Sequence, residues 1–384
     1  MSEIYIHIPF CNSKCLYCDF LSGRADESIH VKLVDAMCRE LVYRKDVFKD
    51  NITSIFIGGG TPSSISSVLI EKLLSTVYEH YHLENDAEIT LESNPGTLTR
   101  EKLLAYKNMG INRISMGLQS CDNDELKMLG RIHTFEQFLE NYNLAREVGF
   151  DNINIDIMQS LPFQTMDKYK KTLEQVIALR PEHISSYSLI IEEGTPLYSR
   201  NDLLEYLPDE DTEREIYYLT NDLLLQNGYH HYEISNYALD SRECKHNLGY
   251  WNRDNYIGIG VGAASLVDDF RFNNIRDTDE YIELVNSYSG GSLLDQPWID
   301  KDTIEELSEN DKMSEFMYLG LREVDGVSSD TFEKTFNKSI DDVFGDVLKK
   351  YIDLELIKTT DMGYALTDKG IDISNYVLSD FILE

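Results

Sequence analysis

The sequence predicts an α/β protein, an open and partial TIM-like barrel of six βα units followed by a smaller helix-rich domain. Six short runs rich in β-branched and aromatic residues alternate with segments of helical period. Such alternation implies a parallel sheet with right-handed crossovers, and six units are too few for the usual eight-stranded barrel. The unusual stretches CNSKCLYC, GGTP, SNPG and QS each follow a strand-like run, where parallel sheets place their active sites. This arrangement favours an enzyme-like site.

The strand-like runs share β-branched residues and a length of six to eight. In chain order they are residues 3–8, 53–59, 87–93, 112–119, 152–158 and 183–190. Amphipathic helices are predicted between them, and the clearest cover residues 29–45, 67–81 and 135–149.

The pattern changes after about residue 200. We expect a helix over residues 213–228, one Tyr/His-rich strand within residues 228–238, and a closing hairpin within residues 356–367. The end of the chain resembles a winged helix. The predicted domains are therefore a partial barrel (1–235), a connecting region (236–300) and a winged-helix-like domain (301–384).

Composition narrows the classes of partner. The chain has 384 residues, of which 42% are hydrophobic, and its net charge is −33. A surface this acidic repels phosphate, so we expect neither nucleic-acid binding nor polybasic docking on anionic lipid. No stretch approaches the length of a membrane span, and the N-terminal residues do not read as a signal peptide. Together with unpatterned cysteines elsewhere, these features predict a cytoplasmic protein.

Three cysteines, Cys11, Cys15 and Cys18, follow the first predicted strand with the spacing C-x3-C-x2-C. Three thiolates can hold three irons of a 4Fe–4S cluster and leave the fourth iron open. A zinc ion is the competing interpretation, but it would need a fourth ligand, for which His7 and Cys38 are the candidates.

The GGGTP stretch at residues 58–62 follows the second predicted strand. Glycines let a ligand approach the backbone closely and expose its N–H and C=O groups. A tight turn in which Pro62 begins a helix explains the same residues equally well.

These motifs together resemble the radical S-adenosylmethionine (SAM) family. Within it, the chain is similar to the branch that contains oxygen-independent coproporphyrinogen III dehydrogenase (HemN) and the heme chaperone HemW. The matching stretches are YIHIPFC, IFIGGGTPS, ESNPG, RISMGLQS, LGRIH, NIDIM with LP, and HNLGYW with DNYIGIGVGAAS. In this family the methionyl amine and carboxylate of SAM chelate the open iron, so the resemblance implies both a 4Fe–4S cluster and SAM as cofactors.

The resemblance also implies which residues contact SAM. They are Tyr5, Gly59, Gly60, Thr61, Glu92, Gln119, Arg131 and Asp156. Carboxylates suit an ammonium or ribose hydroxyls, and the guanidinium suits a carboxylate. The chain departs from the family at Ser160, where a glycine usually precedes Leu-Pro and permits a close approach or a positive φ.

Two functions of the branch compete. The dehydrogenase oxidatively decarboxylates the propionates of coproporphyrinogen III to give protoporphyrinogen IX, whereas the chaperone binds heme and delivers it to apo-hemoproteins. Dehydrogenases carry a fourth cysteine two positions after the third, where this chain has Phe20. They also carry an N-terminal extension ahead of the first strand, whereas the first predicted strand here starts at residue 3. Both features favour the chaperone and leave open whether the chain is an enzyme.

The HNLGYW stretch at residues 246–251 matches the H-N-x-x-Y-W motif of the chaperone branch. His246 is therefore the predicted axial ligand of heme, because imidazole is the commonest protein ligand of heme iron. A packed aromatic turn with a hydrogen-bonded histidine is the structural alternative, and His230 and His231 are other candidate ligands. The expected partners are heme, apo-hemoproteins including membrane respiratory proteins, an electron donor for the cluster, and a second copy in a homodimer.

Overall fold

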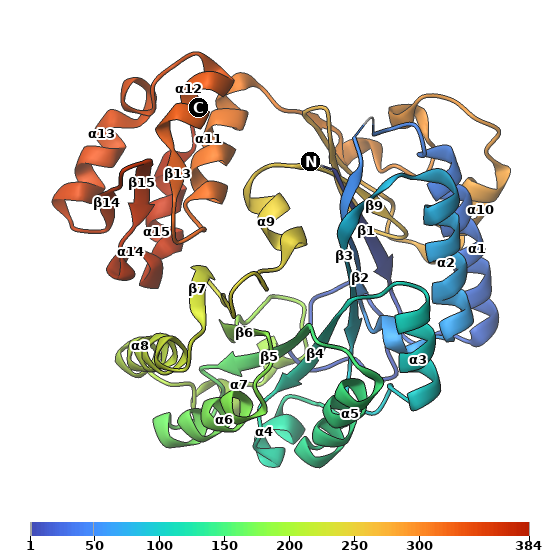
Figure 1. Cartoon of the computed structure of the whole chain (residues 1–384), viewed down its shortest axis with the longest axis horizontal. Helices are drawn as coiled ribbons and strands as arrows, with labels where there is room; N and C mark the ends of the chain where they lie inside the picture. The colour runs from blue at the N-terminus through green and yellow to red at the C-terminus, as the bar shows by residue number, and fades with distance from the viewer. Residues whose placement is uncertain (1, 49, 384) are drawn as a thin grey trace.

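Six parallel strands form the first part of the fold and follow one another in the sheet in chain order. The computed structural model describes residues 2–48 and 50–383. The strands are β1 (Ser2–Ile8), β2 (Ile52–Gly59), β3 (Leu83–Ser93), β4 (Arg113–Gln119), β5 (Ile153–Gln159) and β6 (His183–Ser188). They curve into an open partial barrel (Figure 1), which confirms the predicted architecture.

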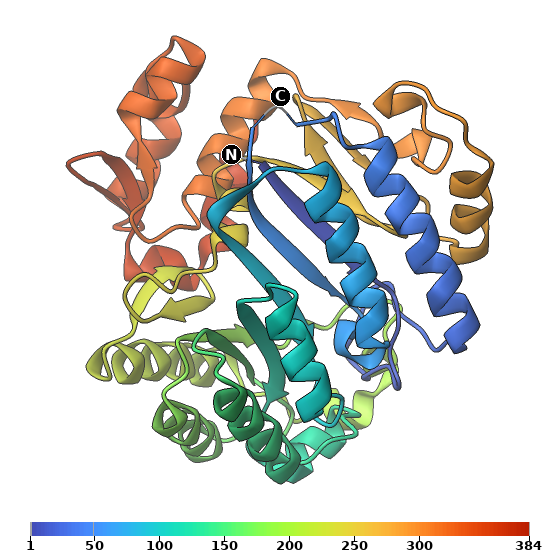
Figure 2. The same ribbon diagram turned by 45° about the vertical axis from the view of Figure 1, so that its right-hand side comes forward.

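Helices cover the outer face of this sheet (Figure 2). Alternate residues of the strands, such as Ile4, Ile6 and Ile8, are buried beneath them in the main core. A capping box at Thr134 begins α5, and Gly149 with φ of +96° ends it. The helices and helical turns of this layer are α1 (Glu27–Tyr43), η1 (Pro62–Ser64), α2 (Ser67–His80), α3 (Arg100–Asn108), α4 (Asn123–Met128), α5 (Phe135–Val148), α6 (Met166–Leu179) and α8 (Glu210–Gln226).

Both edges of the parallel sheet are extended. Beyond β6 lies an antiparallel hairpin, and beyond β1 lies β9, which pairs parallel with it. Within the described residues the whole sheet has twelve strands. The added strands are β7 (His230–Glu233), β8 (Asn236–Ala238), β9 (Asn255–Ile259), β10 (Ala264–Val267), β11 (Phe270–Asn273) and β12 (Glu305–Glu306).

Two sequence predictions differ from this arrangement. The single strand predicted within residues 228–238 is a hairpin, because the chain reverses between Glu233 and Asn236. The boundary proposed after residue 235 consequently falls inside that hairpin. Residues 236–300 do not form a separate connector, since Ile257 and Trp298 belong to the same core as the first six strands.

Helix α9 (Lys245–Trp251) lies against the amino-terminal ends of β1 and β2, on the concave side of the sheet (Figure 1). Glu88 on β3 accepts hydrogen bonds from the backbone N–H groups of Lys245 and His246, at 3.3 and 3.4 Å. A carboxylate at this position stabilises the start of the helix. The HNLGYW stretch therefore closes the end of the barrel remote from the cysteine loop.

The C-terminal domain has its own hydrophobic core and a three-stranded antiparallel sheet. Its hairpin confirms the one predicted within residues 356–367. The guanidinium of Arg322 lies 4.4 Å from the centre of the Trp251 ring and links this domain to α9. Its elements are α11 (Glu309–Gly320), β13 (Val327–Ser328), α12 (Ser329–Phe336), α13 (Ile340–Asp353), β14 (Ile357–Thr359), β15 (Gly363–Leu366), α14 (Asp368–Asp372), α15 (Ser374–Leu378) and η5 (Ser379–Phe381).

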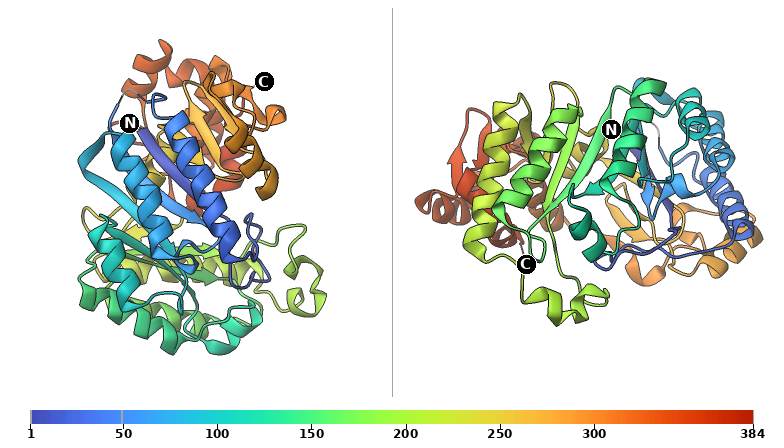
Figure 3. Two further views of the ribbon diagram at one scale, coloured as in Figure 1. Left: turned by 90° about the vertical axis from the view of Figure 1, so that its right-hand side faces the viewer. Right: turned by 90° about the horizontal axis from the view of Figure 1, so that it is seen from below.

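The remaining segments are short. Residues 189–207, with η2 (Leu197–Ser199) and α7 (Asn201–Leu204), project from the carboxyl end of β6 (Figure 3). Helix α10 (Thr278–Ser287) packs on α1, and η3 (Leu293–Asp295) and η4 (Lys301–Thr303) follow it. None of the helices formed by the described residues has the length and hydropathy needed to cross a membrane.

Candidate functional site

A cavity of about 330 Å³ opens at the carboxyl ends of the parallel strands. It brings together every residue predicted to bind the cluster or SAM except Tyr5. These residues are Cys11, Cys15, Cys18, Gly59, Gly60, Thr61, Glu92, Gln119, Arg131 and Asp156. They come from the loops or ends of five strands, which explains why positions spread over 146 residues of sequence meet at one place.

The cysteine loop is held at both of its ends. Cys11 donates its backbone N–H to the carbonyl of Gly23 at 2.9 Å, and Gly23 donates to Pro9 at 3.0 Å. Leu16, within the loop, donates to the carbonyl of Leu129 and accepts from the N–H of Leu197. The loops after β4 and β6 therefore fix the position of the three thiols.

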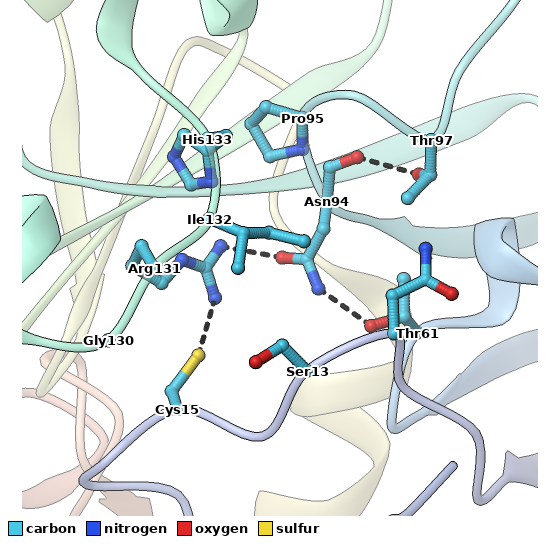
Figure 4. Close-up of a pocket in the computed structure, with 11 residues that line it drawn as sticks. Ser13, Cys15, Thr61, Asn94, Pro95, Thr97, Gly130, Arg131, Ile132 and His133 are labelled. Atoms are coloured by element: carbon cyan, nitrogen blue, oxygen red, sulfur yellow. Dashed lines mark hydrogen bonds between the residues drawn. The ribbon is translucent and has the colours of Figure 1, made fainter.

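Side chains around the loop form a connected hydrogen-bond chain (Figure 4). Arg131 donates from Nη1 to the Sγ of Cys15 at 3.5 Å and from Nη2 to the Oδ1 of Asn94 at 2.6 Å. Asn94 donates from Nδ2 to the Oγ1 of Thr61 at 2.7 Å. That hydroxyl lies 3.3 Å from the Sγ of Cys11. Two of the three thiols are thus joined through three intervening side chains.

The kinds of donor at the cavity bear on which metal group they can hold. All six cysteines are free. Among residues 2–48 and 50–383, no three Cys, His, Asp or Glu side chains are gathered closely enough to surround one metal ion. A zinc ion needs its ligands within about 2.3 Å of a single centre, whereas a cluster takes each thiolate on a different iron. The cavity is lined by three thiols, which is the donor set of a cluster with one open iron, whereas a zinc ion would need a fourth ligand.

The glycine loop after β2 is built for close contact. Gly59 has φ of +107°, and a Cβ placed there would lie 2.6 Å from the ring of His7. A Cβ on Gly60 would lie 2.7 Å from the carbonyl oxygen of Phe10. Side chains are therefore excluded at both positions, and the backbone of this loop borders the cavity directly.

Two carboxylates face this cavity. Desolvation, together with the charge of Asp156, raises the pKa of Glu92 to about 8. Desolvation also raises the pKa of Asp156, although Asn154 and Ser115 donate hydrogen bonds to its oxygens at 2.7 and 3.4 Å. A pair of desolvated carboxyl groups is stabilised by a bound cation, and the amine or sulfonium of SAM has that charge.

Gln119 occupies a strained position at the end of β4. Its φ is +76°, in the left-handed region that non-glycine residues rarely adopt. Its Oε1 accepts a hydrogen bond from the hydroxyl of Tyr187 at 3.0 Å. Backbone strain of this kind concentrates at functional sites, and here it aims the amide into the cavity.

Tyr5 and His246 lie deeper than the other predicted residues. The Tyr5 hydroxyl lies 2.9 Å from Nδ1 of His7, beneath the glycine loop rather than on the wall of the cavity. His246 is 1% exposed. Its Nδ1 lies 2.7 Å from the Oγ of Ser54 and its Nε2 lies 3.0 Å from the hydroxyl of Tyr250.

This environment keeps His246 neutral. Burial lowers the pKa of its imidazole to about 3 and raises the pKa of the neighbouring Glu3 to about 9. Both ring nitrogens have partners, so ligation of a heme iron would require one of these hydrogen bonds to break. The surroundings match the structural alternative, a packed aromatic turn with a hydrogen-bonded histidine.

Several lining residues were not singled out from the sequence. Asn94 belongs to the ESNPG motif and directly follows β3. A polar side chain at the carboxyl end of a parallel strand is the signal that could have identified it as a lining residue. Tyr187 and Ser185 belong to β6, where alternation could have placed them on the concave face. Ser235 and Asn236 could not have been found, because they reach the cavity only through the β7–β8 hairpin.

Comparison with known proteins agrees with the geometry. Residues 5–176 match the family model of the radical SAM superfamily, and residues 307–373 match that of the HemN C-terminal domain. The chain is 35% identical to a protein of Lactococcus lactis named heme chaperone HemW, over 100% of this chain and 98% of that protein. A heme chaperone HemW of Bacillus subtilis is 34% identical over the full length of both chains. The chain belongs to the HemW family.

A solved structure extends this comparison to the fold. Coproporphyrinogen III oxidase (HemN) from Escherichia coli superposes with a TM-score of 0.84, covering 99% of this chain and 90% of that chain at 23% identity. At this identity the similarity establishes the shared fold. Membership of the HemW family, which carries the radical SAM domain, implies a 4Fe–4S cluster and SAM as its cofactors.

Proposed function

We propose that this protein is a heme chaperone that carries a 4Fe–4S cluster and SAM and delivers heme to apo-hemoproteins. The observation that carries the proposal is similarity along the entire chain to two proteins named heme chaperone HemW. The substitution of Phe20 for a fourth cysteine supports the same choice. Its side chain is 63% exposed and borders the cavity, where it offers an apolar surface and no thiolate.

The cluster would be held by Cys11, Cys15 and Cys18, which face one cavity from one pinned loop. When bound, it supplies one-electron reduction beside an iron that no cysteine occupies. The chain's own part is to orient its thiols and to limit access of water. Arg131 and Thr61 contribute by hydrogen bonding to two of them.

SAM would bind in the remainder of the cavity. Glu92 and Asp156 supply negative charge for its amine or ribose hydroxyls, and Arg131 supplies positive charge for its carboxylate. The backbone of Gly59 and Gly60 lies against the ligand because no side chains intervene. Gln119, Thr61 and, from beneath the loop, Tyr5 complete the proposed set.

Heme would contact exposed apolar side chains of the loops that follow the strands at their carboxyl ends. Large ones are Phe20, which borders the cavity, Ile132, Phe163, Ile190 and Tyr206. Phe163 and Tyr206 stack with ring centres 4.2 Å apart. Aromatic faces suit a flat porphyrin. The proposed partners are heme, an apo-hemoprotein and an electron donor for the cluster.

One experiment separates the proposed function from that of the dehydrogenase. Anaerobically reconstituted protein is mixed with reductant and SAM, and either heme or coproporphyrinogen III is added. We expect stoichiometric heme binding, transfer to an apo-hemoprotein on mixing, and no protoporphyrinogen IX. Conversion of coproporphyrinogen III at a catalytic rate, without heme transfer, would contradict the proposal.

A further inference from the structure

Asn94 makes hydrogen bonds through its backbone and through both ends of its side-chain amide. Its N–H lies 3.3 Å from the Oγ of Ser63, and its carbonyl accepts from the Oγ1 of Thr97 at 2.6 Å. Its amide bridges Arg131 and Thr61 (Figure 4). A side chain fixed at so many points has one orientation. That orientation decides the direction of the hydrogen bonds that reach the thiols of Cys11 and Cys15.

The direction of each hydrogen bond follows from the chemistry of the groups. A guanidinium can only donate, so the atom of Asn94 that faces Arg131 is the carbonyl oxygen Oδ1. The other end, Nδ2, is then a donor, and it points to the Oγ1 of Thr61. Since Thr61 accepts there, its own hydroxyl proton remains free for the Sγ of Cys11 at 3.3 Å. The Nη1 of Arg131 meanwhile donates to the Sγ of Cys15 at 3.5 Å.

We propose that Asn94 is a positioning residue that makes both Cys11 and Cys15 acceptors of hydrogen bonds and thereby raises the reduction potential of the bound cluster. Hydrogen bonds to ligand sulfurs stabilise the added electron, so they make reduction easier. This inference rests on the cluster of the proposed function. Asn94 itself touches no thiol and acts only through Thr61 and Arg131.

The test compares Asn94→Ala with wild-type protein after anaerobic reconstitution. Two quantities are measured: the midpoint potential of the cluster, and the couplings of exchangeable protons by electron–nuclear double resonance in H2O and D2O. We expect Asn94→Ala to have a more negative potential and a weaker coupling of the exchangeable proton assigned to Thr61, because the hydroxyl is no longer held toward Cys11. A purely structural role would leave that proton coupling in place.

The matched control, Asn141→Ala, loosens the loop after β3, which contains Asn94, from its other side. Asn141 accepts from the N–H of Gly96 at 2.7 Å and donates to the carbonyl of Leu98 at 3.2 Å, without contact to Arg131 or Thr61. Asn141→Ala should therefore keep the wild-type potential and couplings. If it matched Asn94→Ala in both quantities, the effect would belong to the loop as a whole and the inference would be overturned.

A second variant keeps the test decisive if Asn94→Ala takes up little iron. Asn94→Asp retains an acceptor for Arg131, but its carboxylate cannot donate, so Thr61 turns its proton away from Cys11. We expect this variant to lose the coupling at Cys11 and to retain the one at Cys15. Unchanged couplings in both variants would overturn the inference and leave the proposed function standing. Wild-type protein that bound no iron and sulfide would overturn both.

Discussion

The backbone N–H of Gly59 lies 3.0 Å from the Oε2 of Glu92 and joins the carboxyl ends of β2 and β3 beneath the cavity. This contact fixes the direction in which the carboxyl group faces. A Cβ on Gly58 would lie 2.9 Å from the same oxygen, so the carboxyl group of Glu92 can take this position only because residue 58, in the GGGTP stretch, is glycine. The two motifs are therefore one structural unit.

Binding of SAM should depend on pH through Glu92. Its pKa of about 8 means that the carboxyl group is protonated at lower pH and loses that proton when it accepts a cation. Relative to Glu92→Gln, wild-type affinity should rise between about pH 6 and pH 8, by at most about tenfold per pH unit, and level off above. Isothermal titration of both proteins with SAM measures this ratio, and a ratio independent of pH would exclude Glu92 as the cation's partner.

Of the six cysteines, those of the cysteine loop should be the ones that the cluster requires. We expect Cys15→Ala to abolish the visible iron–sulfur absorbance and the uptake of iron and sulfide, because two thiolates cannot retain the cluster. Cys38→Ala is the control, since Cys38 is buried on α1 away from the cavity. Iron analysis and absorbance of reconstituted proteins provide the measurement. Wild-type iron content in Cys15→Ala would refute the three-thiolate site.

Ser160→Gly should stabilise the protein. Ser160 has φ of +60° and is buried, and its hydroxyl has no partner among the described residues. Relief of the left-handed strain and of the unpaired hydroxyl outweighs the added freedom of the unfolded chain, for a net gain of about 1 kcal/mol.

The free energy of unfolding in urea measures this gain. Ser160→Ala, which removes only the hydroxyl, should gain less than Ser160→Gly. A loss of stability in Ser160→Gly would show that the hydroxyl has a role that its surroundings do not reveal.

His246→Ala should lower the free energy of unfolding by about 2–4 kcal/mol, because it leaves a cavity and two polar groups, Ser54 and Tyr250, without their partner. The heme absorbance of the folded variant should remain at the wild-type position, because both ring nitrogens are engaged within the protein. Denaturant unfolding and a heme titration measure the two quantities. A displaced Soret band would instead show that α9 opens and that His246 reaches the iron.

The sequence by itself determined the periodic elements and the motifs. Runs such as EIYIHI predict their strand because alternate residues must be buried, and the cysteine spacing and GGGTP predict a site because they follow strands. The family resemblance also marked Ser160, whose positive φ is the conformation that the family's usual glycine permits.

Only the tertiary structure decided what depends on contacts between distant segments. The β7–β8 hairpin, the pairing of β9 with β1 and the burial of His246 all arise from packing across the barrel, which no local pattern encodes. The same holds for the chain from Cys15 through Arg131, Asn94 and Thr61 to Cys11. Its direction is set by donors and acceptors that meet only when the loops after β1, β2, β3 and β4 close around one cavity.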